Sequence, residues 1–312
     1  MHYNYQKRIL VFCFVAAVTI YIVVTANFRV SSSISSDIQL KNKLEEVPVP
    51  SGTFNYGGAI SFFSIFREGF ADEIAKAHPQ FKLKLDSSAI GTSKGISGLL
   101  SGKLSFAHSD RPLSQAEIET AKGKGLQLEA IPVAIDAIAV YVNPSTQIKS
   151  LSVASLQDIY QQKINNWQEL GGANLAIVPI SIEPSIDSIS WYKRLNNANE
   201  FYQTYTSALQ AVASTPGSIG YASAAVVAGQ QSVTPISISF NNNNISIPSI
   251  KADSSANTQA FARNIYPLTR RLYIIVPHDG SIREKAAIAY TNLLLSKTGR
   301  KLIEQAGLVA IY

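Results

Sequence analysis

The sequence predicts an α/β protein, in which strands alternate with helices along the chain. Phe81, Leu83 and Leu85 alternate with charged residues, as in a half-buried strand. The run 131–142 is apolar except for Asp136, which is typical of a strand buried on both faces. Between such strands, apolar residues recur at helical spacing, first over 60–74. These three observations together indicate sheets covered by helices.

The other elements follow from the same two periodicities and from their end signals. Ser114 and Glu117 form a capping box, Ser152 can cap the next helix, and Gly307 stops the last one. Further helices are predicted over 96–100, 114–124, 152–160, 204–214, 284–295 and 298–306. Further strands are predicted over 104–107, 175–182, 219–222 and 272–276, with a hairpin within 235–247.

Composition describes a folded, mildly basic protein. Hydrophobic residues make up 46% of the 312 residues and charged residues 15%. Two of the 27 basic residues, Lys7 and Arg8, precede an apolar segment, which leaves 25 bases against 21 acids, or +4, beyond Ala26. Such a charge favours anions but falls far short of a nucleic-acid-binding stripe. Cys13 is the only cysteine, so no internal disulfide is possible, and no Cys/His cluster suggests zinc.

The N-terminal segment points to export. Ile9 to Ala26 is free of charge and follows Lys7-Arg8, so the rest of the chain should lie outside the membrane, in the periplasm or at the cell exterior. Its length suits a signal peptide or a spanning helix, and its end, Val24-Thr25-Ala26, is a poor cleavage site. We therefore favour an uncleaved inner-membrane anchor at residues 9–26. Residues 27–50, which end in Val47-Pro48-Val49-Pro50, are predicted to be an extended tether.

A loop rich in small residues, Ser87 to Gly95, is predicted between the strand at 81–85 and the helix at 96–100. Backbone N–H groups at a helix N-terminus bind anions. The same stretch, Gly91-Thr92-Ser93-Lys94-Gly95, also matches the G-x-S-x-G elbow of serine hydrolases, for which His278 would supply the base. A tight turn that only packs the helix on the sheet is a third interpretation.

A second polar loop, Ser109-Asp110-Arg111, follows the strand at 104–107. Loops that follow neighbouring strands should meet at the sheet edge where ligands of open α/β folds bind. Asp110 may be read alternatively as a turn residue before Pro112, and Arg111 either as a solvated turn residue or as a donor to an anion.

Several short motifs, in family order along the chain, resemble the phosphate-binding proteins of bacterial ABC transporters and their membrane-tethered sensory relatives. They are Ser51-Gly52-Thr53-Phe54, Ile90 to Ile96, Ala107 to Leu113, Lys163-Ile164-Asn165-Asn166-Trp167, Thr215 to Tyr221 with Tyr266 to Arg270, and the tail Gly299 to Gly307. The resemblance implies a two-lobed periplasmic-binding-protein (type II) fold with a hinge of crossing strands. The first lobe would comprise residues 51–138 and 266–312, and the second lobe residues 139–265.

The resemblance also implies the function. A small oxyanion, most simply phosphate, would bind between the lobes without any bond being made or broken, so the protein is expected to be no enzyme and to need no cofactor or metal. Closure would signal to an ABC permease or to a membrane signalling partner. The site residues implied are Thr53, Phe54, Gly91, Thr92, Ser93, Ser109, Asp110, Arg111 and Ser188. Asp110 would accept the proton of monohydrogen phosphate.

The second lobe departs from the family pattern. After the strand ending at Ile182 the family has an arginine and then Gly-Ser-Gly-Thr, whereas this chain has Glu183 to Trp191 with neither the arginine nor the glycines. Loss of one ionic hydrogen bond to a buried anion costs about 1.5–3 kcal/mol, or roughly one to two decades of affinity. Lys94, Arg111 or Arg270 would have to compensate, or the domain has a degenerate cleft that takes another ligand or a partner protein.

Overall fold

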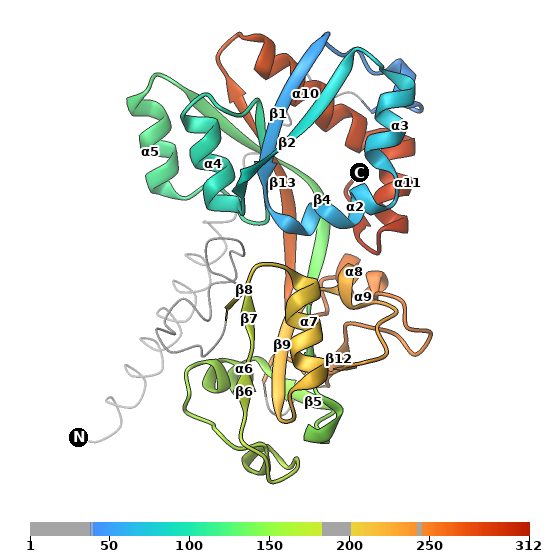
Figure 1. The fold of residues 1–312 in the computed structure, drawn as a ribbon. Coiled ribbons are helices and arrows are strands. Elements are labelled where there is room, and N and C mark those ends of the chain that lie inside the picture. Colours follow the sequence, from blue (N-terminus) through green and yellow to red (C-terminus); the bar gives the residue numbers. More distant parts are fainter. Residues whose placement is uncertain (1–37, 39, 183–200, 242–244) are drawn as a thin grey trace, which may run out of the picture. The chain divides into compact units, whose positions relative to one another are not determined.

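The computed structural model describes residues 38, 40–182, 201–241 and 245–312 (Figure 1). The predicted membrane segment, Ile9 to Ala26, lies outside these ranges. None of the helices within them is both long enough and apolar enough to cross a membrane.

Strands and helices alternate as the sequence predicts. The strands are β1 (Gly52–Gly58), β2 (Phe81–Ile90), β3 (Phe106–Ser109), β4 (Gln127–Val142), β5 (Ser150–Ser152), β6 (Val178–Pro179), β7 (Ser181–Ile182), β8 (Phe201–Tyr202), β9 (Ser218–Ser223), β10 (Thr234–Pro235), β11 (Ser237–Ser239), β12 (Ile247–Pro248), β13 (Thr269–His278) and β14 (Val309–Ala310). The α-helices are α2 (Phe63–Arg67), α3 (Phe70–Ala77), α4 (Thr92–Leu100), α5 (Gln115–Gly123), α6 (Val153–Tyr160), α7 (Tyr205–Ser214), α8 (Ala224–Val227), α9 (Thr258–Ala262), α10 (Ile282–Leu295) and α11 (Lys297–Gln305). Short 3-10 turns include Leu44–Glu46, Ile60–Phe62 and Trp167–Leu170.

The predicted end signals work as expected. Ser114 and Glu117 form the capping box of α5, the Ser152 side chain accepts from the Ser155 N–H at the start of α6, and Gly307 has a φ of 80°. The helix predicted over 60–74 is divided instead. Gly69 has a φ of 88°, which ends α2 and starts α3 at a new angle.

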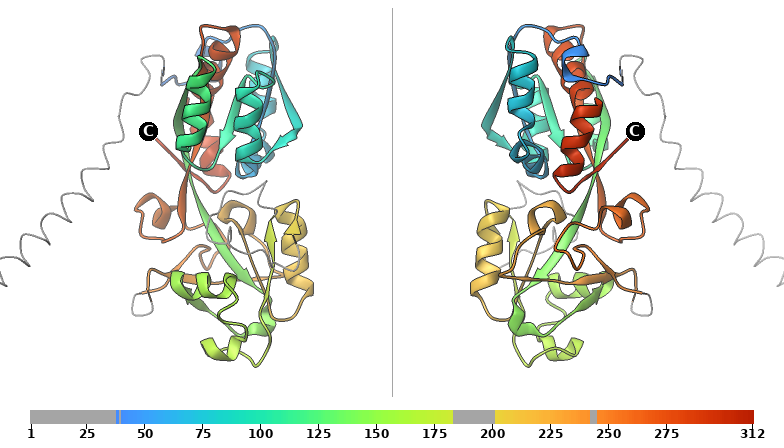
Figure 2. Two further views of the ribbon diagram at one scale, coloured as in Figure 1. Left: turned by 90° about the vertical axis from the view of Figure 1, so that its left-hand side faces the viewer. Right: turned by 90° about the vertical axis from the view of Figure 1, so that its right-hand side faces the viewer.

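The strand β4 joins the two lobes. Its residues up to Ala137 pair with β13, and those from Ile138 onward pair with β9. The main sheet therefore runs through both lobes in the order β2-β1-β3-β13-β4-β9-β6, with β10 and β14 also paired to β4. Both views in Figure 2 show β4 passing from one lobe into the other. The long apolar run is thus a crossing strand, buried in both cores.

Helices cover both faces of the sheet in the first lobe (Figure 1). Neighbouring residues of β13 alternate between the faces, with Ile275 in a cluster with Ile96 and Leu99 of α4, and Ile274 in a cluster with residues of α3, α10 and α11. The second lobe has its own core, which includes Trp167. The Trp167 indole N–H also donates to the Gly217 carbonyl oxygen at 2.7 Å.

The end of the predicted tether is packed rather than extended. Leu44 and Val47 are 3% and 1% exposed and belong to the core of the first lobe. The Leu44 carbonyl lies 2.7 Å from Nε2 of His78, and the Lys41 carbonyl accepts from the Lys297 N–H at 2.9 Å. Burial of these two apolar side chains is more favourable than their exposure in an extended linker would be. The first lobe therefore begins at about residue 41.

Candidate functional site

The two polar loops meet at one edge of the sheet. β1, β2 and β3 are parallel, so their carboxyl ends lie together there. The Thr92 hydroxyl donates to Oδ1 of Asp110 at 2.6 Å and accepts from the Asp110 N–H at 3.2 Å. Thr92 and Asp110 are 1% and 5% exposed. This reciprocal pair locks the start of α4 to the end of β3.

The first of these loops is shorter than the sequence suggests. β2 continues to Ile90 and α4 begins at Thr92, so only Gly91 connects them, not Ser87 to Gly95. Gly91 has a φ of 101°, which allows this abrupt change from strand to helix. The Gly91 N–H donates to the Gly58 carbonyl oxygen at 2.8 Å, and this bond ties the loop to the end of β1.

Arg270 joins Asp110 to the crossing strand. β13 is antiparallel to β3, so its first residues lie at the same edge. Nη1 of Arg270 lies 2.7 Å from Oδ2 of Asp110, and Nη2 and Nε lie 3.0 and 3.1 Å from Oδ2 of Asp136 on β4. Nη2 also donates to the hydroxyl of Tyr205, at the start of α7 in the second lobe, at 3.1 Å. One guanidinium therefore links two buried acids of the first lobe to the second lobe.

Asp136 is the one charged residue within the apolar run 131–142, and it is fully buried. Its Oδ1 accepts from the Ser223 hydroxyl at 2.7 Å and from the Ala137 N–H at 2.8 Å. Burial raises the pKa of Asp136, while Arg270, Ser223 and the Ala137 N–H oppose that rise. Asp136 was noted in the sequence only as an interruption, because its partner Arg270 lies 134 residues further along the chain.

Arg111 is held on its own loop. Its two terminal nitrogens donate to the two carboxylate oxygens of Glu117, both at 2.8 Å, in the forked arrangement typical of Arg–carboxylate pairs. Nη2 also donates to the Ser93 hydroxyl at 3.3 Å. The Ser109 hydroxyl donates to the Arg111 carbonyl oxygen at 2.6 Å, which fixes the turn. The sequence alone does not identify Glu117 as the partner of Arg111, because the capping box with Ser114 already explains a glutamate at this position.

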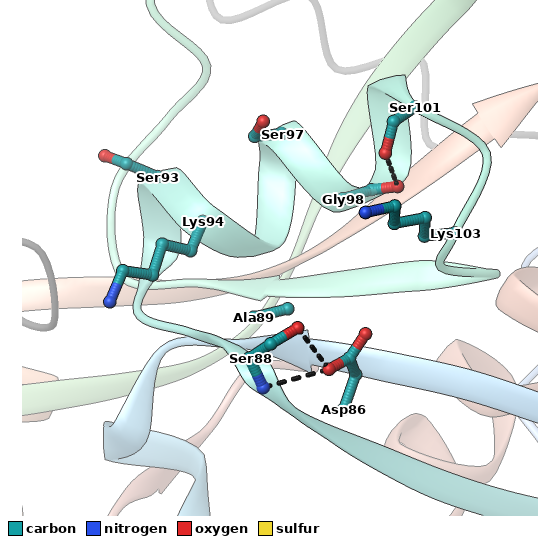
Figure 3. A pocket seen from close by; sticks show the side chains of 9 residues that line it. All are labelled: Asp86, Ser88, Ala89, Ser93, Lys94, Ser97, Gly98, Ser101 and Lys103. Carbon is teal, nitrogen blue, oxygen red and sulfur yellow. Dashed lines mark hydrogen bonds between the residues drawn. The ribbon is translucent and has the colours of Figure 1, made fainter.

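Ser93 lies on the outer side of α4. It lines a groove of about 340 Å³ with Ser97, Lys94, Lys103 and Asp86, as Figure 3 shows. Asp86 at the floor of this groove accepts bonds from the N–H and hydroxyl of Ser88 at 2.9 and 2.6 Å. The neighbouring side chains of Thr92 and Ser93 therefore have different surroundings, since only Thr92 is bonded to Asp110.

The structure places Thr53 and Phe54 away from this group. Thr53 pairs with Lys82 at the start of β1, five residues before Gly58 or about 17 Å along the strand. Phe54 is buried and its ring centroid lies 5.1 Å from that of Phe81. The resemblance thus set the first loop at the wrong end of β1. The loop at the correct end begins at Gly58, and the signal for it was the Gly57-Gly58 pair before the first helix.

The corrected loop runs from Gly58 to Ser61. The Ala59 N–H donates to the His108 carbonyl oxygen at 3.0 Å, so this loop is bound to β3. Ser61 is 1% exposed, and its hydroxyl finds no hydrogen-bond partner among the described residues. Ser188, which the sequence predicts as the cap from the second lobe, lies outside the described residues, as does the whole altered segment from Glu183 to Trp191.

His108 is a packed core residue next to Asp110. It stacks on Phe62 with ring centroids 4.1 Å apart, and Nε2 lies 3.0 Å from the Tyr290 hydroxyl. Burial lowers the pKa of His108 from 6.5 to about 3, so the ring is neutral at physiological pH.

This buried histidine predicts acid lability. Because the unfolded chain takes up the proton near pH 6.5 and the folded chain only near pH 3, stability falls as pH drops between these values. Lowering the pH from 7 to 5 should cost about 2 kcal/mol through this group. Urea denaturation of wild type and His108→Gln at both pH values checks it. The variant should lose that part of the pH dependence, and an unchanged difference between the two pH values would contradict the assignment.

The histidine proposed for a hydrolase is engaged elsewhere. His278 lies at the far end of β13, five residues or about 17 Å beyond Tyr273, which pairs with Ser109. Its ring nitrogens lie 2.8 Å from Glu129 and from Glu284. Burial lowers the pKa of His278, but these two carboxylates raise it by more, so it stands above its ordinary value. The triad with Ser93 is therefore not formed.

Comparison with known proteins gives the family. A family model described as PBP superfamily domain matches residues 46–298. The phosphate-binding protein PstS of Borreliella burgdorferi is 25% identical over 246 residues, which cover 73% of this chain and 80% of that protein. Protein SphX of Synechococcus elongatus is 28% identical over 131 residues, which cover 41% of this chain and 38% of that protein.

A solved structure shows the same fold. The crystal structure of an ABC-type phosphate transport receptor from Vibrio cholerae superposes with a TM-score of 0.64 at 20% identity, over 82% of this chain and 99% of that one. The fold with its crossing strand and the match to the family model point to the same family. The chain therefore belongs to the PBP superfamily, where its relatives include phosphate-binding proteins.

Proposed function

We propose that the chain is an extracytoplasmic substrate-binding protein that captures a small oxyanion, in the first place phosphate, between its two lobes. The observation that supports this most directly is the buried Asp110–Arg270 pair beside the N-terminus of α4, which the Tyr205 hydroxyl joins from the second lobe. The relative from Borreliella burgdorferi named above is a phosphate-binding protein, which supports phosphate as the anion.

Each part of this edge has a role in the proposal. The first N–H groups of α4, after Gly91, would donate to the anion at the positive end of the helix dipole. Asp110 would accept the proton of monohydrogen phosphate, and its charge would repel sulfate, which carries no proton near pH 7. Thr92 would position Asp110. Ser61 and, from the second lobe, Ser188 would add hydroxyl donors.

Closure of the lobes would carry the signal. β4 belongs to both lobes, and Arg270 lies where β4 changes partners while contacting Tyr205. An anion bound at Asp110 would thereby favour one arrangement of Tyr205 and the second lobe. The closed form would be received by an ABC permease or by a membrane signalling partner.

Calorimetric titration of the full chain with phosphate and with sulfate at pH 7.5 tests the proposal. Wild type should bind phosphate and reject sulfate. Asp110→Asn removes the repulsion of sulfate, so the variant should gain sulfate binding. The ratio of its phosphate affinity to its sulfate affinity should fall by about tenfold or more. Asp86→Asn is the matched control, because Asp86 lies in the outer groove of Figure 3 and should leave both affinities unchanged.

The outcomes separate clearly. If wild type binds neither anion at millimolar concentration, the oxyanion proposal fails. If Arg111→Gln abolishes phosphate binding, the guanidinium reaches the ligand and the role given to Glu117 is wrong. We expect that variant to keep its phosphate affinity within about threefold, because Glu117 already holds the fork of Arg111.

A further inference from the structure

An apolar pocket lies beside the proposed anion site. It has a volume of about 310 Å³, and its lining includes Ile60, Phe63 and Ile90 from the first lobe and Tyr205 and Val226 from the second. Arg67 and four uncharged polar residues, Ser64, Gln203, Thr204 and Thr206, also line it. Figure 1 labels the helices α2, α7 and α8, which carry Phe63, Tyr205 and Val226. The volume is at the small end of the range for ligand pockets, roughly 300–1,000 Å³.

Two of its walls adjoin the polar loops. Ile90 is the last residue of β2, directly before Gly91 and Thr92, and Ile60 lies within the loop that follows β1, from Gly58 to Ser61. At these two positions the chain presents branched aliphatic side chains to the pocket. Phe63 adds an aromatic ring that is 38% exposed. A fully hydrated, doubly charged anion gains nothing from these groups and loses water to them.

Tyr205 connects the pocket to the anion site. Its ring lines the pocket, while its hydroxyl accepts from Nη2 of Arg270, whose Nη1 lies 2.7 Å from Asp110. A ligand with an anionic end near Arg270 and Asp110 would thus have its other end among apolar side chains. The lining residue Arg67 donates to the Ala225 carbonyl oxygen at 3.4 Å and lies 3.5 Å from Glu68, so its charge is already partly balanced.

We propose that the site prefers an oxyanion that carries a short apolar group, of the alkylphosphonate class, over the bare phosphate ion. This inference rests on the proposed oxyanion site and specifies its substrate class. The anionic head would take the place given above to phosphate, and the alkyl group would fill the pocket against Ile60, Phe63 and Ile90. Burial of the alkyl chain would supply affinity in place of the arginine that the family pattern has after Ile182 and this sequence lacks.

Titration of the full chain with inorganic phosphate and with methyl-, ethyl-, propyl- and butylphosphonate tests the proposal. Each buried CH₂ group should tighten binding by about fourfold until the pocket is full. Phe63→Ser, on a partly exposed position that should tolerate the change, should flatten this series, and Ile60→Thr should shift preference back towards phosphate. Phe240→Ser is the matched control, since Phe240 is 55% exposed and does not line the pocket.

The possible results distinguish this inference from the function beneath it. If phosphate binds and added alkyl groups bring no gain, the alkylphosphonate inference is overturned while the oxyanion site stands. If neither phosphate nor any phosphonate binds, the oxyanion site itself is overturned. If the series tightens but is unaffected by both Phe63→Ser and Ile60→Thr, the alkyl group lies elsewhere and the assignment to this pocket is wrong.

Discussion

Arg270→Met is expected to lower the free energy of unfolding by about 3–5 kcal/mol at pH 7. The substitution leaves Asp110 and Asp136, which are 5% and 0% exposed, without the guanidinium that binds both. Buried carboxylates that lose their cation are far less stable than solvated ones even when hydrogen bonds remain, so the loss should exceed that of any surface ion pair. Because domains are stable by only about 5–15 kcal/mol, this loss is a large fraction of the total stability.

Two measurements make the cause visible. Urea denaturation of Arg271→Met gives the matched control, since the neighbouring Arg271 is exposed and the same substitution there should cost no more than about 0.5 kcal/mol. The deficit of Arg270→Met should also shrink as pH falls towards 4. Burial raises the pKa of Asp136 and Arg270 opposes that rise, so without Arg270 protonation of Asp136 in the folded state removes a buried charge more readily. A deficit that stays constant with pH would show that lost packing, not unpaired charge, causes it.

Gly58→Ala is expected to cost about 4 kcal/mol or more, and to abolish ligand binding with it. A Cβ atom at this position would lie 2.0 Å from the His108 carbonyl oxygen and 2.8 Å from the His108 nitrogen, and both atoms are backbone. Gly58 also has a φ of 112°, which side-chain-bearing residues rarely adopt. Relief of the clash would separate β1 from β3 and break the bond from the Ala59 N–H to His108.

Two other glycines give graded controls. Gly69 has a φ of 88° but nothing within 4 Å of a Cβ atom, so Gly69→Ala should cost only the backbone strain, about 1–2 kcal/mol. Gly123, at the end of α5, has neither a close neighbour nor a positive φ, so Gly123→Ala should be neutral or stabilising by up to about 1 kcal/mol. Thermal unfolding of the three variants should follow this order. A Gly58→Ala protein as stable as Gly69→Ala would contradict the close approach of β1 and β3.

Much of the fold could be predicted because it depends on local patterns. The capping box at Ser114 needs only a hydroxyl and a carboxylate three residues apart, and the long strand ending at Val142 needs only a run that is apolar except for Asp136. The meeting of Thr92 with Asp110 followed from strand order, since loops after neighbouring parallel strands share an edge. The family motifs also predicted which loops meet at this edge. The prediction from Ser51 to Phe54 was wrong, because Thr53 and Phe54 lie at the other end of β1.

What the sequence determined by itself was therefore the α/β class, the long buried strand over 131–142 and the identity of the two loops that carry Thr92 and Asp110. The crossing of that strand between lobes was implied by the family resemblance. Only the tertiary structure decided their partners. Arg270 binds Asp110 across 160 residues of chain, and Glu117 takes the fork of Arg111, which the sequence left open between ligand and solvent. The pocket between Ile60, Ile90 and Tyr205 likewise exists only after folding. Periodicity and caps are set by neighbours in the chain, whereas ion pairs and pockets depend on which distant surfaces packing brings together.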